Sequence, residues 1–64
     1  MFTVMARTHF GKTWEMTCID DEMAYMLFDT ARKAVDCKNA VIVDATTGEI
    51  LAEYENGKLT YYSE

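Results

Sequence analysis

Apolar side chains recur at helical spacing in residues 20–36, DDEMAYMLFDTARKAVD. At about 100° per residue they fall within an arc of about 140°, the width of a stripe that faces a protein core. The stripe consists of Met23, Ala24, Leu27, Phe28, Ala31, Ala34 and Val35. Asp20 is placed to cap the start of this helix, and Asn39 can adopt the left-handed conformation that ends one. The pattern predicts one helix, with Tyr25 and Met26 on its outer face.

Two stretches before the helix, Phe2–Thr8 and Thr13–Cys18, alternate between apolar and polar residues, which is typical of strands. A three-residue loop at residues 9–11, with Gly11 in a left-handed conformation, joins them into a hairpin. The register that follows pairs Ala6 with Trp14, Val4 with Met16, and Phe2 with Cys18. All these apolar partners then share one face, so we expect Trp14 to be a core residue beneath the helix.

Three more strands are predicted after the helix. Residues 40–45 include three consecutive β-branched residues, and residues 49–55 form the next strand. Asn56 and Gly57 are the strongest two-residue hairpin signal. This turn pairs Glu55 with Lys58, Tyr54 with Leu59, Ala52 with Tyr61, and Leu51 with Tyr62.

The order ββαβββ predicts an α+β fold in two layers, a five-stranded antiparallel sheet with one helix on one face. Residues 1–64 form a single domain, because so short a chain builds only one small core. The favoured strand order is 2-1-3-4-5, with 2-1-5-4-3 as the alternative. Both orders keep the sheet antiparallel and allow a right-handed crossover through the helix.

One face of this sheet has no second layer to cover it. A three-residue loop at residues 46–48 turns Ile42, Ile50, Ala52, Tyr54, Leu59 and Tyr61 towards the helix, and Val41, Val43, Leu51 and Tyr62 away from it. A four-residue loop instead turns Ile42 outward and Val41 and Val43 inward. Both registers leave Leu51 and Tyr62 on the uncovered face, where apolar residues among acids can mark a contact site.

The net charge of the chain restricts the classes of partner that such a site could bind. The net charge is −5, and residues 39–64 hold Asp44, Glu49, Glu53, Glu55 and Glu64 against Lys58 alone, a net of −4. Direct binding to a nucleic-acid backbone or to an anionic membrane requires the opposite charge. No stretch is long and apolar enough to span a membrane, and the N-terminus lacks a signal pattern, so we expect a cytoplasmic protein.

No residue pattern predicts catalysis, a cofactor or a metal site. His9 is the single histidine and lies in a predicted turn, while capping explains Asp20 and its acidic neighbours. Cys18 and Cys37 stand at opposite ends of the helix, too far apart for a disulfide. We therefore expect a protein that is not an enzyme, with Cys18 in the core and reduced thiols.

Two functions remain. The first is a protein-binding module, or an inhibitor, that presents an acidic face to a basic nucleic-acid-binding protein through Leu51, Glu53, Glu55 and Tyr62. In size, acidity and α+β composition the chain resembles the small anti-CRISPR proteins of phages, which implies such an inhibitor; no shared motif carries this resemblance. A second candidate face is formed by Tyr25 and Met26. The alternative function is a self-associating structural protein, a homodimer through the uncovered face or an edge strand.

Overall fold

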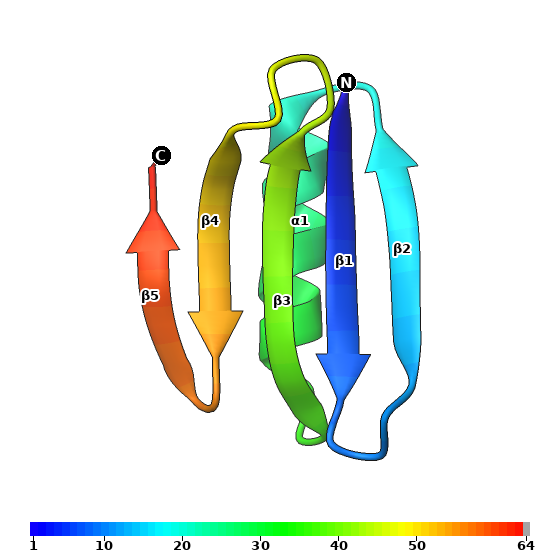
Figure 1. The fold of residues 1–64 in the computed structure, drawn as a ribbon, viewed down its shortest axis with the longest axis vertical. Coiled ribbons are helices and arrows are strands. Elements are labelled where there is room, and N and C mark those ends of the chain that lie inside the picture. Colours follow the sequence, from blue (N-terminus) through cyan, green and yellow to red (C-terminus); the bar gives the residue numbers. More distant parts are fainter. Residues whose placement is uncertain (64) are drawn as a thin grey trace.

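The computed structural model describes residues 1–63 as a five-stranded antiparallel sheet with one helix packed on one face (Figure 1). The elements are β1 (Phe2–Thr8), β2 (Thr13–Cys18), α1 (Asp21–Arg32), β3 (Cys37–Asp44), β4 (Ile50–Glu55) and β5 (Lys58–Tyr62). The strand order is β2-β1-β3-β4-β5, so both the predicted α+β fold and the favoured order are confirmed.

The helix begins as the sequence predicts. The Asp20 carboxylate accepts a hydrogen bond from the Met23 N–H at 2.8 Å, which satisfies one of the free donors of the first turn. The predicted end is wrong, because α1 stops at Arg32 and Asn39 lies in β3. Residues 33–36 form a turn that directs the chain back into the sheet. As a result Val35, predicted to face the core, is fully exposed.

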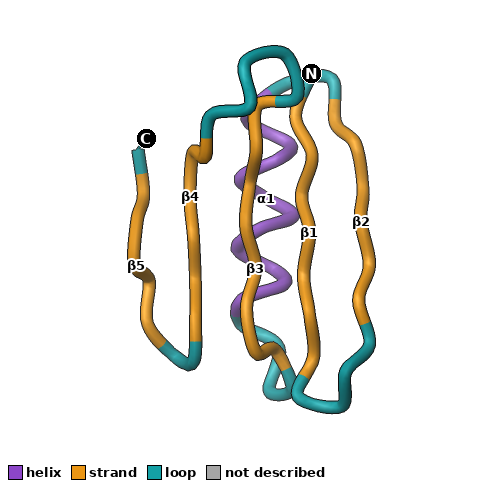
Figure 2. Tube along the Cα trace, in the orientation of Figure 1, coloured by secondary structure: helices purple, strands orange, loops and turns teal. Residues whose placement is uncertain are grey.

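The core lies mainly between α1 and the adjacent strands β1 and β3 (Figure 2). Its largest fully buried side chains are Phe28, Ile42 and Val4. One helix cannot cover five strands, so the helix-side residues of β2 stay partly open, with Trp14 40% and Met16 50% exposed. The prediction of Trp14 as a buried core anchor is therefore wrong, whereas Cys18 is buried as expected.

The register of the first hairpin is confirmed. Ala6 opposes Trp14, Val4 opposes Met16, and Phe2 opposes Cys18. Gly11 has a φ of +83°, and the Thr8 N–H donates to the Lys12 carbonyl at 2.8 Å, which closes the three-residue loop.

The connection between β3 and β4 combines a longer loop with a β-bulge. The Asp44 N–H donates to the Glu49 carbonyl at 2.8 Å, so four residues, 45–48, form the loop. Val43 opposes Ile50 while Ile42 opposes Ala52, which leaves Leu51 as an extra residue in β4. The extra residue in β4 compensates for the extra residue in the loop, so beyond the bulge β3 and β4 pair as they would with a three-residue loop. Ile42 therefore faces the helix as the three-residue register predicts, but Ile50 faces outward, which corrects that prediction.

A second bulge shifts the last strand. The pairs of Tyr54 with Leu59 and of Glu55 with Lys58 are confirmed, and the turn between them has positive φ at Asn56 and Gly57. Beyond Tyr54 the register moves by one residue at Thr60, whose hydroxyl donates to the Glu53 carbonyl at 3.0 Å. The remaining predicted pairs are therefore wrong: Tyr61 opposes Glu53, and Tyr62 opposes the buried Ala52.

Candidate functional site

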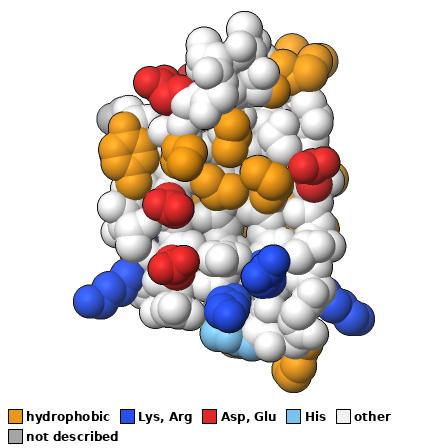
Figure 3. All heavy atoms as spheres, in the orientation of Figure 1, with side chains coloured by type: hydrophobic (Ala, Val, Ile, Leu, Met, Phe, Trp, Pro, Cys, Tyr) orange, Lys and Arg blue, Asp and Glu red, His pale blue; other side chains and the backbone are white. Residues whose placement is uncertain are grey.

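The sheet face opposite α1, here the open face, carries a band of apolar side chains. Met5 opposes Val41, Val43 opposes Ile50, and Tyr61 lies beside Glu53, which in turn opposes Val41. The apolar band thus consists of Met5, Val41, Val43, Ile50 and Tyr61. Ile50 is 44% and Tyr61 49% exposed. Figure 3 views this face and shows apolar side chains crossing its middle.

Carboxylates border the apolar band. Glu15 opposes Met5 on β2, Glu53 lies between Val41 and Tyr61, and Glu55 follows on the same face of β4. All three acids are exposed, so their charges are available to a partner in solution. The predicted site residues Glu53 and Glu55 thus lie on the uncovered face.

The open face is hollowed rather than flat. A shallow hollow of about 540 Å³ is lined by residues that include Met5, Val41, Val43, Ile50 and Glu53. Its lining also holds Arg7 and the three acids Glu15, Glu53 and Glu55, so an apolar hollow has a mixed, mainly acidic rim, which suits a protruding apolar side chain next to a basic one.

Leu51 and Tyr62 do not lie on this face, which corrects the prediction of their orientation. The Tyr62 ring lies 5.2 Å from the Tyr25 ring and 6.3 Å from the Phe28 ring, measured between centroids. Leu51 packs against the same core. The two bulges are the reason, because each moves the outward position to the preceding residue, Ile50 or Tyr61.

The second candidate face is divided. Tyr25 packs against the core, and its hydroxyl lies 3.2 Å from the Ser63 hydroxyl, within hydrogen-bond distance. Met26 is 65% exposed on the outer side of α1. The two side chains therefore do not form one surface.

A second hollow of about 540 Å³ lies beside the start of α1, on the helix side of the sheet. It brings Leu51 and Tyr25 together with the carboxylates of Asp21, Glu22 and Asp44. Within residues 1–63, no three His, Cys, Asp or Glu side chains form a group that could hold a metal ion. No pattern in the sequence indicates this hollow, because its residues come from distant elements.

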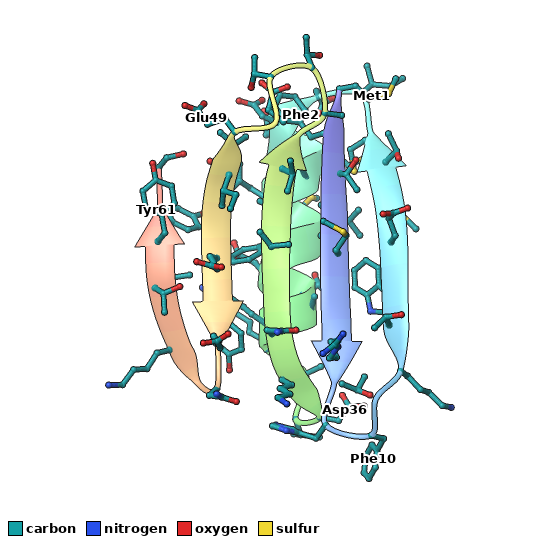
Figure 4. All side chains as sticks on the ribbon, in the orientation of Figure 1. Met1, Phe2, Phe10, Asp36, Glu49 and Tyr61 are labelled. Carbon is teal, nitrogen blue, oxygen red and sulfur yellow. The ribbon has the colours of Figure 1, made fainter. Side chains whose placement is uncertain are left out.

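Basic residues are concentrated at one end of the long axis of the molecule. The strand directions place every lysine and arginine at the end that carries the β1–β2 and β4–β5 turns (Figures 1 and 3). These residues are Arg7, Lys12, Arg32, Lys33, Lys38 and Lys58, here the basic end, where they outnumber three acids, Asp29, Asp36 and Glu55. The opposite, acidic end carries Asp20, Asp21, Glu22, Asp44 and Glu49; Figure 4 marks it by Glu49 and the basic end by Phe10. Glu64, counted in the −4 above, lies outside the described residues.

The Cys37 thiol is not activated as a nucleophile. Cys18 and Cys37 are both free and buried. Burial raises the pKa of the Cys37 thiol, and the neighbouring Asp36 carboxylate raises that pKa further. The Sγ atom of Cys37 donates to the Asn39 carbonyl oxygen at 3.6 Å. Cys37 is thus held as a neutral thiol, and the thiolate is the reactive form.

Comparisons with protein-family models, curated proteins and solved structures find no match. No helix in the described part of the chain is long and apolar enough to cross a membrane.

Proposed function

We propose that this protein is a non-enzymatic binding module that presents its open face to a basic protein. The observation that carries the proposal is the uncovered apolar band bordered by Glu15, Glu53 and Glu55. In this arrangement the apolar band supplies the anchor, and the carboxylates select the charge of the partner.

The apolar band supports a docking role because its exposed members are large. Tyr61 and Ile50 are each nearly half exposed, and Ile50 lines the hollow together with Val41 and Val43. Aromatic and large aliphatic groups that become buried at the centre of an interface hold a complex together. A contiguous exposed apolar patch rimmed by polar groups is a common mark of such a contact.

Charge supports a basic partner. The chain has a net charge of −5, and a second copy docked face to face would bring the carboxylates of Glu15, Glu53 and Glu55 near those of its partner. A basic surface instead gains from these charges, which accelerate encounter and exclude acidic competitors.

Nucleic-acid-binding proteins expose basic surfaces of this kind, and carboxylates can take the positions of phosphates there. We therefore assign the partner to this class, so the protein would act as an inhibitor, in the manner of the small phage proteins that it resembles. Its place of action would be the cytoplasm, where the two free thiols stay reduced.

The partner can be found by placing a photo-crosslinking amino acid at Tyr61 and, as a matched control, at Met26, which is exposed on α1 away from the open face. We expect a covalent adduct with a basic protein from the Tyr61 position only. Equal adducts from both positions would contradict the proposal.

Kinetics with the identified partner then separate the roles of charge and anchor. Glu53→Lys combined with Glu55→Lys should slow association and flatten its salt dependence, whereas Tyr61→Ala should speed dissociation. If these variants bind like wild type while a change at Met26 abolishes binding, the contact face is the helix.

A further inference from the structure

The two edges of the sheet differ in their protection. On β5 the bulge at Thr60 and the charge of Lys58 interrupt the edge, which are two common defences against pairing with another strand. The other edge, β2, pairs with β1 over Thr13–Cys18 without a bulge, and this segment contains no lysine and no proline. Within residues 1–63, no element covers its outer side (Figure 1). β2 is therefore a regular edge with room for another strand.

Backbone hydrogen bonds to β1 alternate along β2, and this alternation shows which backbone N–H and C=O groups of β2 point away from the sheet. The Thr8 N–H donates to the Lys12 carbonyl, and inward bonding alternates along an antiparallel pair. The residues of β2 that bond to β1 are thus Trp14, Met16 and Cys18. The backbone groups of Thr13, Glu15 and Thr17 point away from the sheet.

The helix side of this edge is apolar and uncharged. Trp14 is 40% and Met16 50% exposed, since α1 covers mainly β1 and β3. Tyr25 packs towards β5, and Met23, two residues earlier, lies on the other flank of the helix and is 55% exposed. On the helix side of this margin a second copy would meet Trp14, Met16 and Met23 rather than carboxylates.

We infer that two copies of this chain associate through antiparallel pairing of their β2 strands, with Met16 opposite Met16 of the second copy. This register is compatible with the backbone hydrogen bonds of β2. It pairs Glu15 with Thr17 of the second copy, and the backbone groups of both residues point away from their own sheet. The neighbouring register would set Glu15 directly against its own copy, and like charges in that position are destabilising.

The segregated charges favour the same arrangement. Antiparallel neighbours place the basic end of one copy beside the acidic end of the other. In the inferred register Lys12 stands opposite Asp20 of the second copy, and the two-fold axis creates this pair twice. A second copy is therefore complementary in charge, because in the antiparallel orientation its acidic end lies beside the basic end of the first copy.

The dimer closes the uncovered margin and joins the two open faces. Both helices lie on one side of the continuous sheet, with Trp14 and Met16 of both copies between them. The open faces lie together on the other side. Of the residues given a role in the proposed function, only Glu15 lies in β2, and its side chain stays on the open face while its backbone pairs, so the pairing does not depend on that function.

The first test is the oligomeric state of the full chain and of two charge variants, by sedimentation equilibrium over a range of concentrations. We expect the mass to approach that of a dimer with rising concentration. Lys12→Glu should raise the dimer dissociation constant by roughly tenfold, since it replaces two attractive pairs by repulsive ones. Lys58→Glu, which changes the net charge equally but lies at the far edge, should leave the constant near that of wild type.

The second test is a crosslink at the two-fold axis. Cα atoms in a non-hydrogen-bonded antiparallel pair lie about 4.5 Å apart, within the range of a disulfide. Met16→Cys should therefore give a covalent dimer on mild oxidation, whereas Met26→Cys, at a position on α1 that is at least as exposed, should not. If Lys12→Glu fails to fold, the crosslinking result by itself tests whether the β2 strands pair. A monomer at every concentration, equal effects of the two charge variants, or equal crosslinking at both positions would overturn the inference.

Discussion

The β1–β2 hairpin and the β3–β5 meander are built from the same alternating pattern, yet only the hairpin follows it throughout. The hairpin keeps one register from Phe2 to Arg7. The meander changes register at Leu51 and again at Thr60. Each bulge exchanges the two faces for the residues beyond it, so a local backbone detail decides which of two adjacent apolar side chains meets the solvent.

The largest expected effect tests whether the two regions share one core. Phe28 is fully buried, and its ring lies 6.3 Å from that of Tyr62 in the meander. Phe28→Ala should lower the free energy of unfolding by about 3–5 kcal/mol, a large part of the stability of so small a domain. Denaturation followed by the fluorescence of Trp14, which reports on the hairpin, and by far-UV circular dichroism should give coincident transitions. A hairpin signal that outlasts the rest would show that the regions fold separately.

The adjacent tyrosines of β5 test the bulge at Thr60. Tyr62→Ala removes a ring packed against Tyr25 and Phe28, and we expect a loss of about 1–3 kcal/mol of unfolding free energy. Tyr61→Ala removes an outward side chain and should change it by less than about 0.5 kcal/mol. Urea denaturation of both variants measures the difference. The opposite order of losses would mean that β5 has no bulge.

The glycines of the two tight turns should respond alike, since the regions differ in their bulges and not in their turns. Gly11 and Gly57 have φ of +83° and +85°, and no atom lies within 4 Å of the position of an added Cβ at either. Backbone strain alone should therefore cost about 1–3 kcal/mol in Gly11→Val and in Gly57→Val. Thermal melts of the two variants compare the costs. A variant that melts like wild type would contradict the left-handed turn at that position.

The smallest effect concerns pH at the start of the meander. Burial and the Asp36 carboxylate raise the pKa of Cys37 above its ordinary value of 9.0, so the folded state holds this proton more tightly than the unfolded state does. The corresponding stabilisation is complete below about pH 9 and is lost as the pH rises through the raised value. Melting temperatures across this range should fall more steeply for wild type than for Cys37→Ala. Equal slopes would show that the thiol does not contribute.

Local chemistry explains what the sequence could predict. Asp20 caps its helix, and Asn56 and Gly57 form their turn. The alternation from Phe2 to Cys18 sets the register of the first hairpin, because a slip by one residue would expose its apolar side chains to water. Glu53 and Glu55 were placed on the open face for the same reason, because the pairing near the turn is regular.

The remaining features depend on tertiary context. Neither bulge has a signal in sequence, since Leu51 and Thr60 are ordinary strand residues, and so the apolar anchors were misplaced by one position. The helix ends early because the chain must return to the sheet, where the Asp36 carbonyl accepts the His9 N–H at 2.9 Å. The exposure of Trp14 follows from where α1 lies across the sheet, which no strand pattern encodes.

The separation of the basic and acidic ends gives the molecule a permanent dipole along its 30 Å axis. Near a charged surface such a particle is turned as well as attracted or repelled, so it arrives with a preferred end leading. Two variants with the same net charge can then differ in how often they collide productively. Moving one lysine from the basic end to the acidic end would change the orientation of approach while leaving the isoelectric point almost unaltered.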